Sequence, residues 1–147
     1  MKPYVLVLFG GRSNEREVSL VTGNAVTQAL TATGYKVKSI DVGENIESIL
    51  ANLDPKPDVV FNALHGRYGE DGNIQGLLNY LEIKYTHSGV LSSAIAFNKP
   101  IAKLIMANAG IKVAEHQLVT YEQFSDGNIM SPPYVMKPIN EGSSVGV

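Results

Sequence analysis

The first half of the chain alternates short apolar runs with segments of helical periodicity. Residues 4–9 form a continuous apolar run, which is typical of a buried parallel strand, and residues 35–42 and 58–64 read as two further strands. Between the first two strands, residues 17–33 repeat apolar side chains at helical spacing. We expect Asn14 to cap this helix. Its predicted buried face consists of Val18, Val21, Ala25 and Ala29.

Three more helical segments continue the pattern. Residues 46–53 predict a short helix, and residues 74–81 carry the i, i+3, i+4, i+7 stripe of an amphipathic helix. After a short strand and loop at residues 85–89, residues 90–97 form an apolar helix that packs in the core or serves an interface, with the core favoured. The order βαβαβα with short connections predicts a parallel, doubly wound α/β domain.

The pattern changes after Lys99. Pro100 suits the first turn of a new helix that runs to Ala109, and residues 113–120 and 134–137 read as strands. The element order is now helix, strand, short helix, strand, which differs from the βα repeat before it.

We therefore divide the chain into an N-terminal α/β domain, residues 1–98, and the beginning of a second domain, residues 99–147. The last residues lie inside a Gly/Ser-rich turn directly after a predicted strand. Because domains rarely end within such an element, we expect the chain to be a fragment of a longer protein.

Composition narrows the class of protein. The chain has 147 residues, is 44% hydrophobic and 18% charged, and carries a net charge of −2, so it offers no basic surface for nucleic acid or an anionic membrane. It has no cysteine, which excludes disulfides and thiolate metal sites and fits a reducing cytoplasm. The apolar run near the N-terminus is too short for a signal peptide core or a membrane span.

The twelve residues from His65 to Gly76 are the most informative segment. Four of them are glycines, which cost conformational entropy, so a particular backbone shape is required there. They place an imidazole and two carboxylates where a strand meets a helix, the edge at which α/β sheets bind ligands. His65 is either a ligand-binding or a structural histidine, and Glu70 is placed to orient its imidazole. Asp71 is placed to cap the next helix. With no second nitrogen ligand at the required spacing, we expect no metal site in this chain.

Three other positions suggest ligand binding. Glu15 follows a Gly-Gly turn at a helix start, where it either stabilises the helix dipole or binds a ligand's ammonium. Lys99 stands at another helix start and Lys137 closes an apolar strand, so each is a solvated lysine or a phosphate contact. The Gly/Ser loop from residue 142 offers donors as phosphate-binding loops do, although it is no Walker A motif.

Four sequence motifs, taken in their order along the chain, resemble those of the D-alanine–D-alanine ligases of the ATP-grasp superfamily. The motifs are residues 10–19, 65–76, 98–99 and 137–146, so the resemblance covers the whole chain. It implies a Rossmann-like (pre-ATP-grasp) N-terminal domain followed by the start of an ATP-grasp central domain. It also implies an activity in peptidoglycan precursor synthesis: ATP phosphorylates the carboxylate of one D-alanine, and the amine of a second attacks the acyl phosphate.

The resemblance also implies residue roles. Glu15 would bind the ammonium of the first D-alanine, and His65 would lie near its carboxylate. Lys99 and Lys137 would contact ATP phosphates. Ser143 would hydrogen-bond toward Glu15 and order the closed site.

ATP and Mg²⁺ are implied as cofactors, with the magnesium ligands beyond Val147, so we expect the isolated chain to be inactive. A cytoplasmic homodimer formed through the N-terminal domain is implied as well. Two alternatives stay open: a related ligase that uses D-lactate or D-serine as second substrate, and a non-catalytic binding or dimerisation module.

Overall fold

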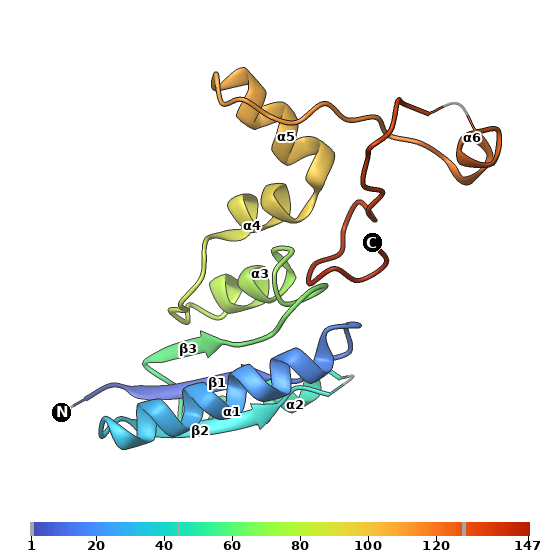
Figure 1. Cartoon of the computed structure of the whole chain (residues 1–147). Coiled ribbons are helices and arrows are strands. Elements are labelled where there is room, and N and C mark those ends of the chain that lie inside the picture. The colour runs from blue at the N-terminus through green and yellow to red at the C-terminus, as the bar shows by residue number, and fades with distance from the viewer. Residues whose placement is uncertain (1, 44, 128) are drawn as a thin grey trace.

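A parallel sheet of three strands organises the first part of the chain (Figure 1). The computed structural model describes residues 2–43, 45–127 and 129–147. Strand β1 (Tyr4–Phe9) lies in the middle, with β2 (Lys36–Asp41) on one side and β3 (Val59–Asn62) on the other, both parallel to it. The side chains of residues 5–8 are at most 3% exposed, which explains why β1 is apolar at consecutive positions.

Helices cover both faces of the sheet. Val5 and Val7 point to the face covered by α1 (Arg16–Ala32), since strand side chains alternate. Leu6 and Leu8 point to the other face, where they pack with residues of α2 (Glu47–Leu50) and α3 (Asn73–Tyr80). The predicted parallel, doubly wound α/β unit is therefore confirmed. The predicted short strand at residues 85–89 is reduced to one bridge between Tyr85 and Val60.

The face of α1 that meets the sheet differs from the prediction. Val18 and Val21 are 44% and 72% exposed, and the residues on the sheet side are instead Ser19, Gly23, Val26 and Leu30. Gly23 explains the choice, because a Cβ there would lie 2.2 Å from the Cβ of Phe9. Small residues let the helix approach β1 closely, a requirement that apolar periodicity does not reveal. Asn14 is not the cap either: the N-cap residue is Glu15, and its side chain makes no capping hydrogen bond.

Replacing Leu78 with alanine should lower the free energy of unfolding by about 2–5 kcal/mol, because the substitution opens a cavity in the core between the sheet and α3. Leu78 is fully buried in α3. Leu104→Ala is the matched control, since Leu104 is 61% exposed and its replacement should change stability by less than about 0.5 kcal/mol. Chemical denaturation measures both; equal losses would contradict the assigned core.

The helix at residues 90–97 forms but is not part of the core, so that expectation is wrong. In α4 (Val90–Phe97) only Ser93 is buried. The neighbouring α5 (Lys99–Asn108) has no buried residue, and Asn98 caps it by accepting a hydrogen bond from the Ile101 N–H. Within the described residues, no single helix is long and apolar enough to cross a membrane; only α4 and α5 taken together reach that length and composition, with a bend of 105° between them.

The two strands predicted after α5 are absent from the described residues. Residues 113–120 and 134–137 have no regular structure, and only the short α6 (Tyr121–Ser125) lies between them. A strand requires a partner to complete its backbone hydrogen bonds, and neither segment pairs with another described segment. The C-terminal segment instead runs back toward the sheet, so that its end lies near the loop before α3 (Figure 1).

Candidate active site

The candidate site lies at the carboxyl edge of β1 and β3. The connection after β1 leads to β2 on one side of β1, and the chain returns to β3 on the other side, so a switch point lies at this edge. Ligands of open α/β sheets bind at such a switch point. A cavity of about 220 Å³ opens there, lined by residues that include Gly10, Arg12, Leu64 and Tyr68.

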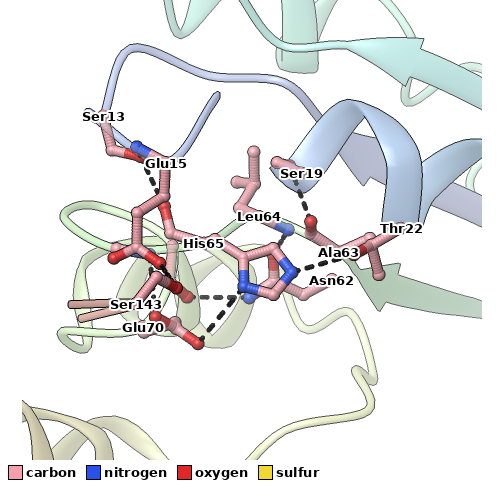
Figure 2. Close-up of polar contacts among 12 residues, drawn as sticks. Ser13, Glu15, Ser19, Thr22, Asn62, Ala63, Leu64, His65, Glu70 and Ser143 are labelled. Carbon is pink, nitrogen blue, oxygen red and sulfur yellow. Dashed lines mark hydrogen bonds and ion pairs between the residues drawn. The ribbon is translucent and has the colours of Figure 1, made fainter. Parts of the chain in front are cut away.

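Glu15 is the most unusual residue of the site. It is a carboxylate that is only 3% exposed. Its Oε2 accepts a hydrogen bond from the Ser143 hydroxyl, while its Oε1 has no hydrogen-bond partner among the described residues (Figure 2). Gly66 and Gly142 leave room for it, because a Cβ at these positions would lie 3.0 and 2.8 Å from Oε1. A buried anionic oxygen without a donor is costly, so this atom is suited to accept from a ligand.

His65 lies beside Glu15, with Thr22 and Glu70 on either side of its imidazole (Figure 2). Its Nε2 is 3.1 Å from the Thr22 hydroxyl oxygen, and its Nδ1 is 4.0 Å from Oε1 of Glu70. The other oxygen of Glu70 accepts a hydrogen bond of 2.7 Å from the Gly66 N–H. The structure therefore brings Glu15, His65, Glu70 and Ser143 together, four of the six residues singled out in the sequence.

A polar stripe on α1, which sequence reasoning missed, joins the two loops. Ser19 is fully buried, donates to the Ala63 carbonyl at 2.7 Å and accepts from the Gly10 N–H at 2.8 Å. Ser13 donates to the His65 carbonyl at 2.7 Å. The spacing of Glu15, Ser19 and Thr22 is i, i+4, i+7, which places them on one helix face. That polar periodicity is the sequence signal for this stripe, and apolar periodicity alone does not detect it.

Buried amides fix the loop after β3. Asn62 and Gln75 both donate to the carbonyl of Gly69, at 2.8 and 2.9 Å, and Asn62 also accepts from the Leu64 N–H. Asp71 accepts from the N–H of Asn73, the first residue of α3, although the N-cap position itself is Gly72. These contacts hold the loop shape that the glycines permit.

The two lysines are placed differently. The Lys99 ammonium donates to the carbonyls of Ile139 and Glu141, and so ties α5 to the loop that carries Ser143. Lys137 is exposed and has no hydrogen-bond partner in the described part of the chain. A second cavity, of about 430 Å³, lies between α4 and this loop and is lined in part by Asn98, Pro138 and Glu141. Neither lysine is among the lining residues of this cavity, and only Lys99 contacts the loop, so the structure does not bring Lys99 and Lys137 together with Glu15.

An ion pair supports the loop after β1. Arg16 contacts both carboxylate oxygens of Asp41, at 2.8 and 2.5 Å, and also donates to the Gly11 carbonyl at 3.0 Å. The hydrogen bonds from Arg16 lower the pKa of Asp41 below its ordinary value, and the Gly43 N–H adds to that effect. This pair therefore links the end of β2 to the turn that leads to Glu15.

The pH dependence of stability should reveal this pair. A carboxylate with a lowered pKa in the folded state stabilises the fold above its unfolded pKa of about 4, and this contribution is lost as the pH falls through the folded pKa. At pH 7 the free energy of unfolding should be larger for the wild type than for Asp41→Asn, and the two values should converge as the pH falls below about 4. A difference that stays constant with pH would contradict the assignment.

Known proteins resemble this chain in sequence and in fold. The model of the family described as D-ala D-ala ligase N-terminus matches residues 4–54 and 46–88. The D-alanine–D-alanine ligase of Acidiphilium cryptum is 52% identical over 143 residues, which cover 97% of this chain and 48% of that protein. A crystal structure of the Bacillus anthracis ligase is 34% identical with a TM-score of 0.74, and the match covers 97% of this chain and 47% of the other. A second structure of that ligase, complexed with ATP, is 32% identical with a TM-score of 0.66 and covers 86% and 45%.

The chain thus spans about half the length of the curated relatives it matches. The family match includes the loops that carry Glu15, His65 and Glu70 and extends over more than half of the chain. The chain therefore belongs to the D-alanine–D-alanine ligase N-terminus family.

Proposed function

We propose that this chain is the N-terminal half of an ATP-dependent ligase that joins two D-alanines into D-alanyl-D-alanine, a peptidoglycan precursor. One observation carries the proposal: the Glu15 carboxylate is buried at the switch point, with Oε2 held by Ser143 and Oε1 without a partner among the described residues. An ammonium group supplies the charge and the donors that such an oxygen requires. The names of the relatives support D-alanine as the amino acid.

The first D-alanine would be bound by its charged ends. Its ammonium would donate to Oε1 of Glu15, and the imidazole of His65 would lie near its carboxylate. The contact between Nε2 of His65 and the Thr22 hydroxyl limits the rotation of that imidazole, and Glu70 lies 4.0 Å from its Nδ1. Fixing the amino acid at both ends orients the carboxylate oxygen toward the incoming phosphoryl group, and orientation alone supplies a large part of rate acceleration.

ATP would approach from the side of the two lysines. Lys99 already holds the loop of Ser143, and Lys137 is exposed and available to phosphate oxygens. Positive charge and backbone donors at this place would offset the charge that develops during phosphoryl transfer. Mg²⁺ would neutralise phosphate charge when bound, with ligands that we assign to the part of the longer protein after Val147.

The proposed reaction has two steps. A carboxylate oxygen of the first D-alanine attacks the γ-phosphorus of ATP, and ADP leaves. The amine of the second D-alanine then attacks the carbonyl carbon of the acyl phosphate. A C–N bond forms, a proton is released, and phosphate departs with the oxygen that came from the carboxylate.

Isotope transfer tests this route. The complete protein is supplied with ATP, Mg²⁺ and D-alanine that carries ¹⁸O in both carboxylate positions, and phosphate is analysed by mass spectrometry. One ¹⁸O atom per phosphate is expected for each dipeptide formed. Dipeptide accompanied by unlabelled phosphate would overturn the acyl-phosphate route, and absence of dipeptide would overturn the ligase assignment. D-lactate and D-serine as added acceptors test the second-substrate preference.

The proposal includes a cytoplasmic homodimer formed through residues 1–98, with the second domain beginning at Lys99. The exposure of apolar side chains on α4, such as Leu91 at 73%, supports a contact surface on this part of the chain. Light scattering on the complete protein tests the dimer; a monomeric mass at micromolar concentration would contradict it.

A further inference from the structure

Three side chains of the site offer potential metal-ligand atoms and make no hydrogen bonds with one another among the described residues. They belong to Glu15, His65 and Glu70, whose potential ligand atoms all lie within 4.8 Å of one another (Figure 2). We propose that these three residues form a binding site for a divalent transition-metal ion of the Zn²⁺ class. The sequence did not indicate this, because residues 15 and 65 are far apart in the chain and only one nitrogen ligand is present.

In each residue, one polar side-chain atom contacts a hydrogen-bond partner and another is available to bind a metal ion. Glu15 uses Oε2 for Ser143, and its fully buried Oε1 has no partner among the described residues. Glu70 uses Oε2 for the Gly66 N–H. Its Oε1 is 4.0 Å from Nδ1 of His65, too far for a hydrogen bond. The structure therefore leaves two carboxylate oxygens and one ring nitrogen for a shared cation.

Thr22 prepares the imidazole for this role. A ligating histidine typically uses its other ring nitrogen in a hydrogen bond that fixes the tautomer. Nε2 of His65 is 3.1 Å from the Thr22 hydroxyl oxygen. When Nε2 donates to that oxygen, Nδ1 presents a lone pair toward the carboxylate of Glu70. Two acceptors that face each other are stabilised by a cation between them.

The ligand set selects the kind of ion. One imidazole and two carboxylates match the nitrogen and oxygen ligands of zinc, whereas Mg²⁺ prefers oxygen alone. Tetrahedral zinc needs its ligand atoms about 3.3 Å apart, so the side chains must close slightly around the ion. His65 and Glu70 can do so, since their side chains are 27% and 39% exposed. A fourth position remains for water.

A bound ion would also affect the substrate. Glu15 Oε1 is the atom that the proposed function assigns to the ammonium of D-alanine, so an ion in this site would block that position. This consequence rests on the proposed function, whereas metal binding itself does not. Zinc binding is therefore measured without D-alanine or ATP, and its failure would leave the ligase assignment intact.

Titration calorimetry with ZnCl₂ on this chain tests the proposal, in a buffer that does not coordinate zinc. We expect one equivalent to bind, and His65→Gln and Glu70→Gln each to weaken binding by about tenfold or more. Glu70→Gln keeps an acceptor for the Gly66 N–H, and thermal melting of each variant verifies that it is folded. His116→Gln is the control, because it removes an exposed histidine outside the site. Equal zinc affinity in the wild type and Glu70→Gln, or equal weakening by His116→Gln, would overturn the site.

Discussion

Replacing Glu15 with glutamine should weaken D-alanine binding by the complete protein at least about 30-fold and leave ATP binding nearly unchanged. Loss of one partner from a buried, hydrogen-bonded charge pair costs about 2–5 kcal/mol, and 2 kcal/mol corresponds to about 30-fold. The side chain is 3% exposed, so water does not replace the missing charge. Glutamine preserves the shape and an acceptor for the Ser143 hydroxyl. The measurement is the dissociation constant for each ligand separately.

Glu17→Gln is the matched control for this variant. Glu17 stands two residues later, in the first turn of the same helix, and is exposed. The Glu17→Gln substitution removes the same charge from the same end of α1 but lies outside the site, so the affinity for D-alanine should change little. If Glu15→Gln weakened both ligands equally, or if Glu17→Gln had the same effect on D-alanine, Glu15 would be a structural residue.

Lys137→Ala should show the opposite selectivity, with ATP bound about tenfold or more weakly and D-alanine affinity preserved. A hydrogen bond from a charged group contributes about 1.5–3 kcal/mol, and the exposure of Lys137 favours the lower end of that range. Because this side chain makes no hydrogen bond within the described residues, its removal should not disturb the fold. The measurement is the dissociation constant of ATP at physiological ionic strength.

Lys112→Ala provides the comparison for the loss of positive charge, since Lys112 is exposed on the segment after α5. It should leave ATP affinity within about twofold, as expected of a screened surface charge. Unchanged ATP affinity in Lys137→Ala would remove Lys137 from the nucleotide site.

The sequence predicted the sheet well because β1 is buried on both faces. Consecutive apolar residues are then required, and few other structures produce that pattern. Glu15 and His65 were singled out by their places after the first and third strands, and the structure brings them close because adjacent parallel strands end at the same edge of the sheet. The contact between Glu15 and Ser143 joins residues 128 positions apart, and only the resemblance to known ligases suggested it.

Other features depend on tertiary packing. Apolar periodicity predicted a buried face for α1 through Val18 and Val21, but Gly23 permits a closer approach on a different face. The apolar composition of α4 predicted burial, although its contacts with α3 and α5 leave only Ser93 buried. Residues 134–137 have the composition of a strand, yet a strand needs a partner, and composition does not supply one.

We propose that this chain belongs to a longer enzyme that activates D-alanine with ATP. Phosphate release from ATP, measured with and without D-alanine on this chain and on the complete protein side by side, tests it most directly. We predict D-alanine-dependent release by the complete protein and none by the 147-residue chain. A complete protein that releases no phosphate with D-alanine would rule out this activity.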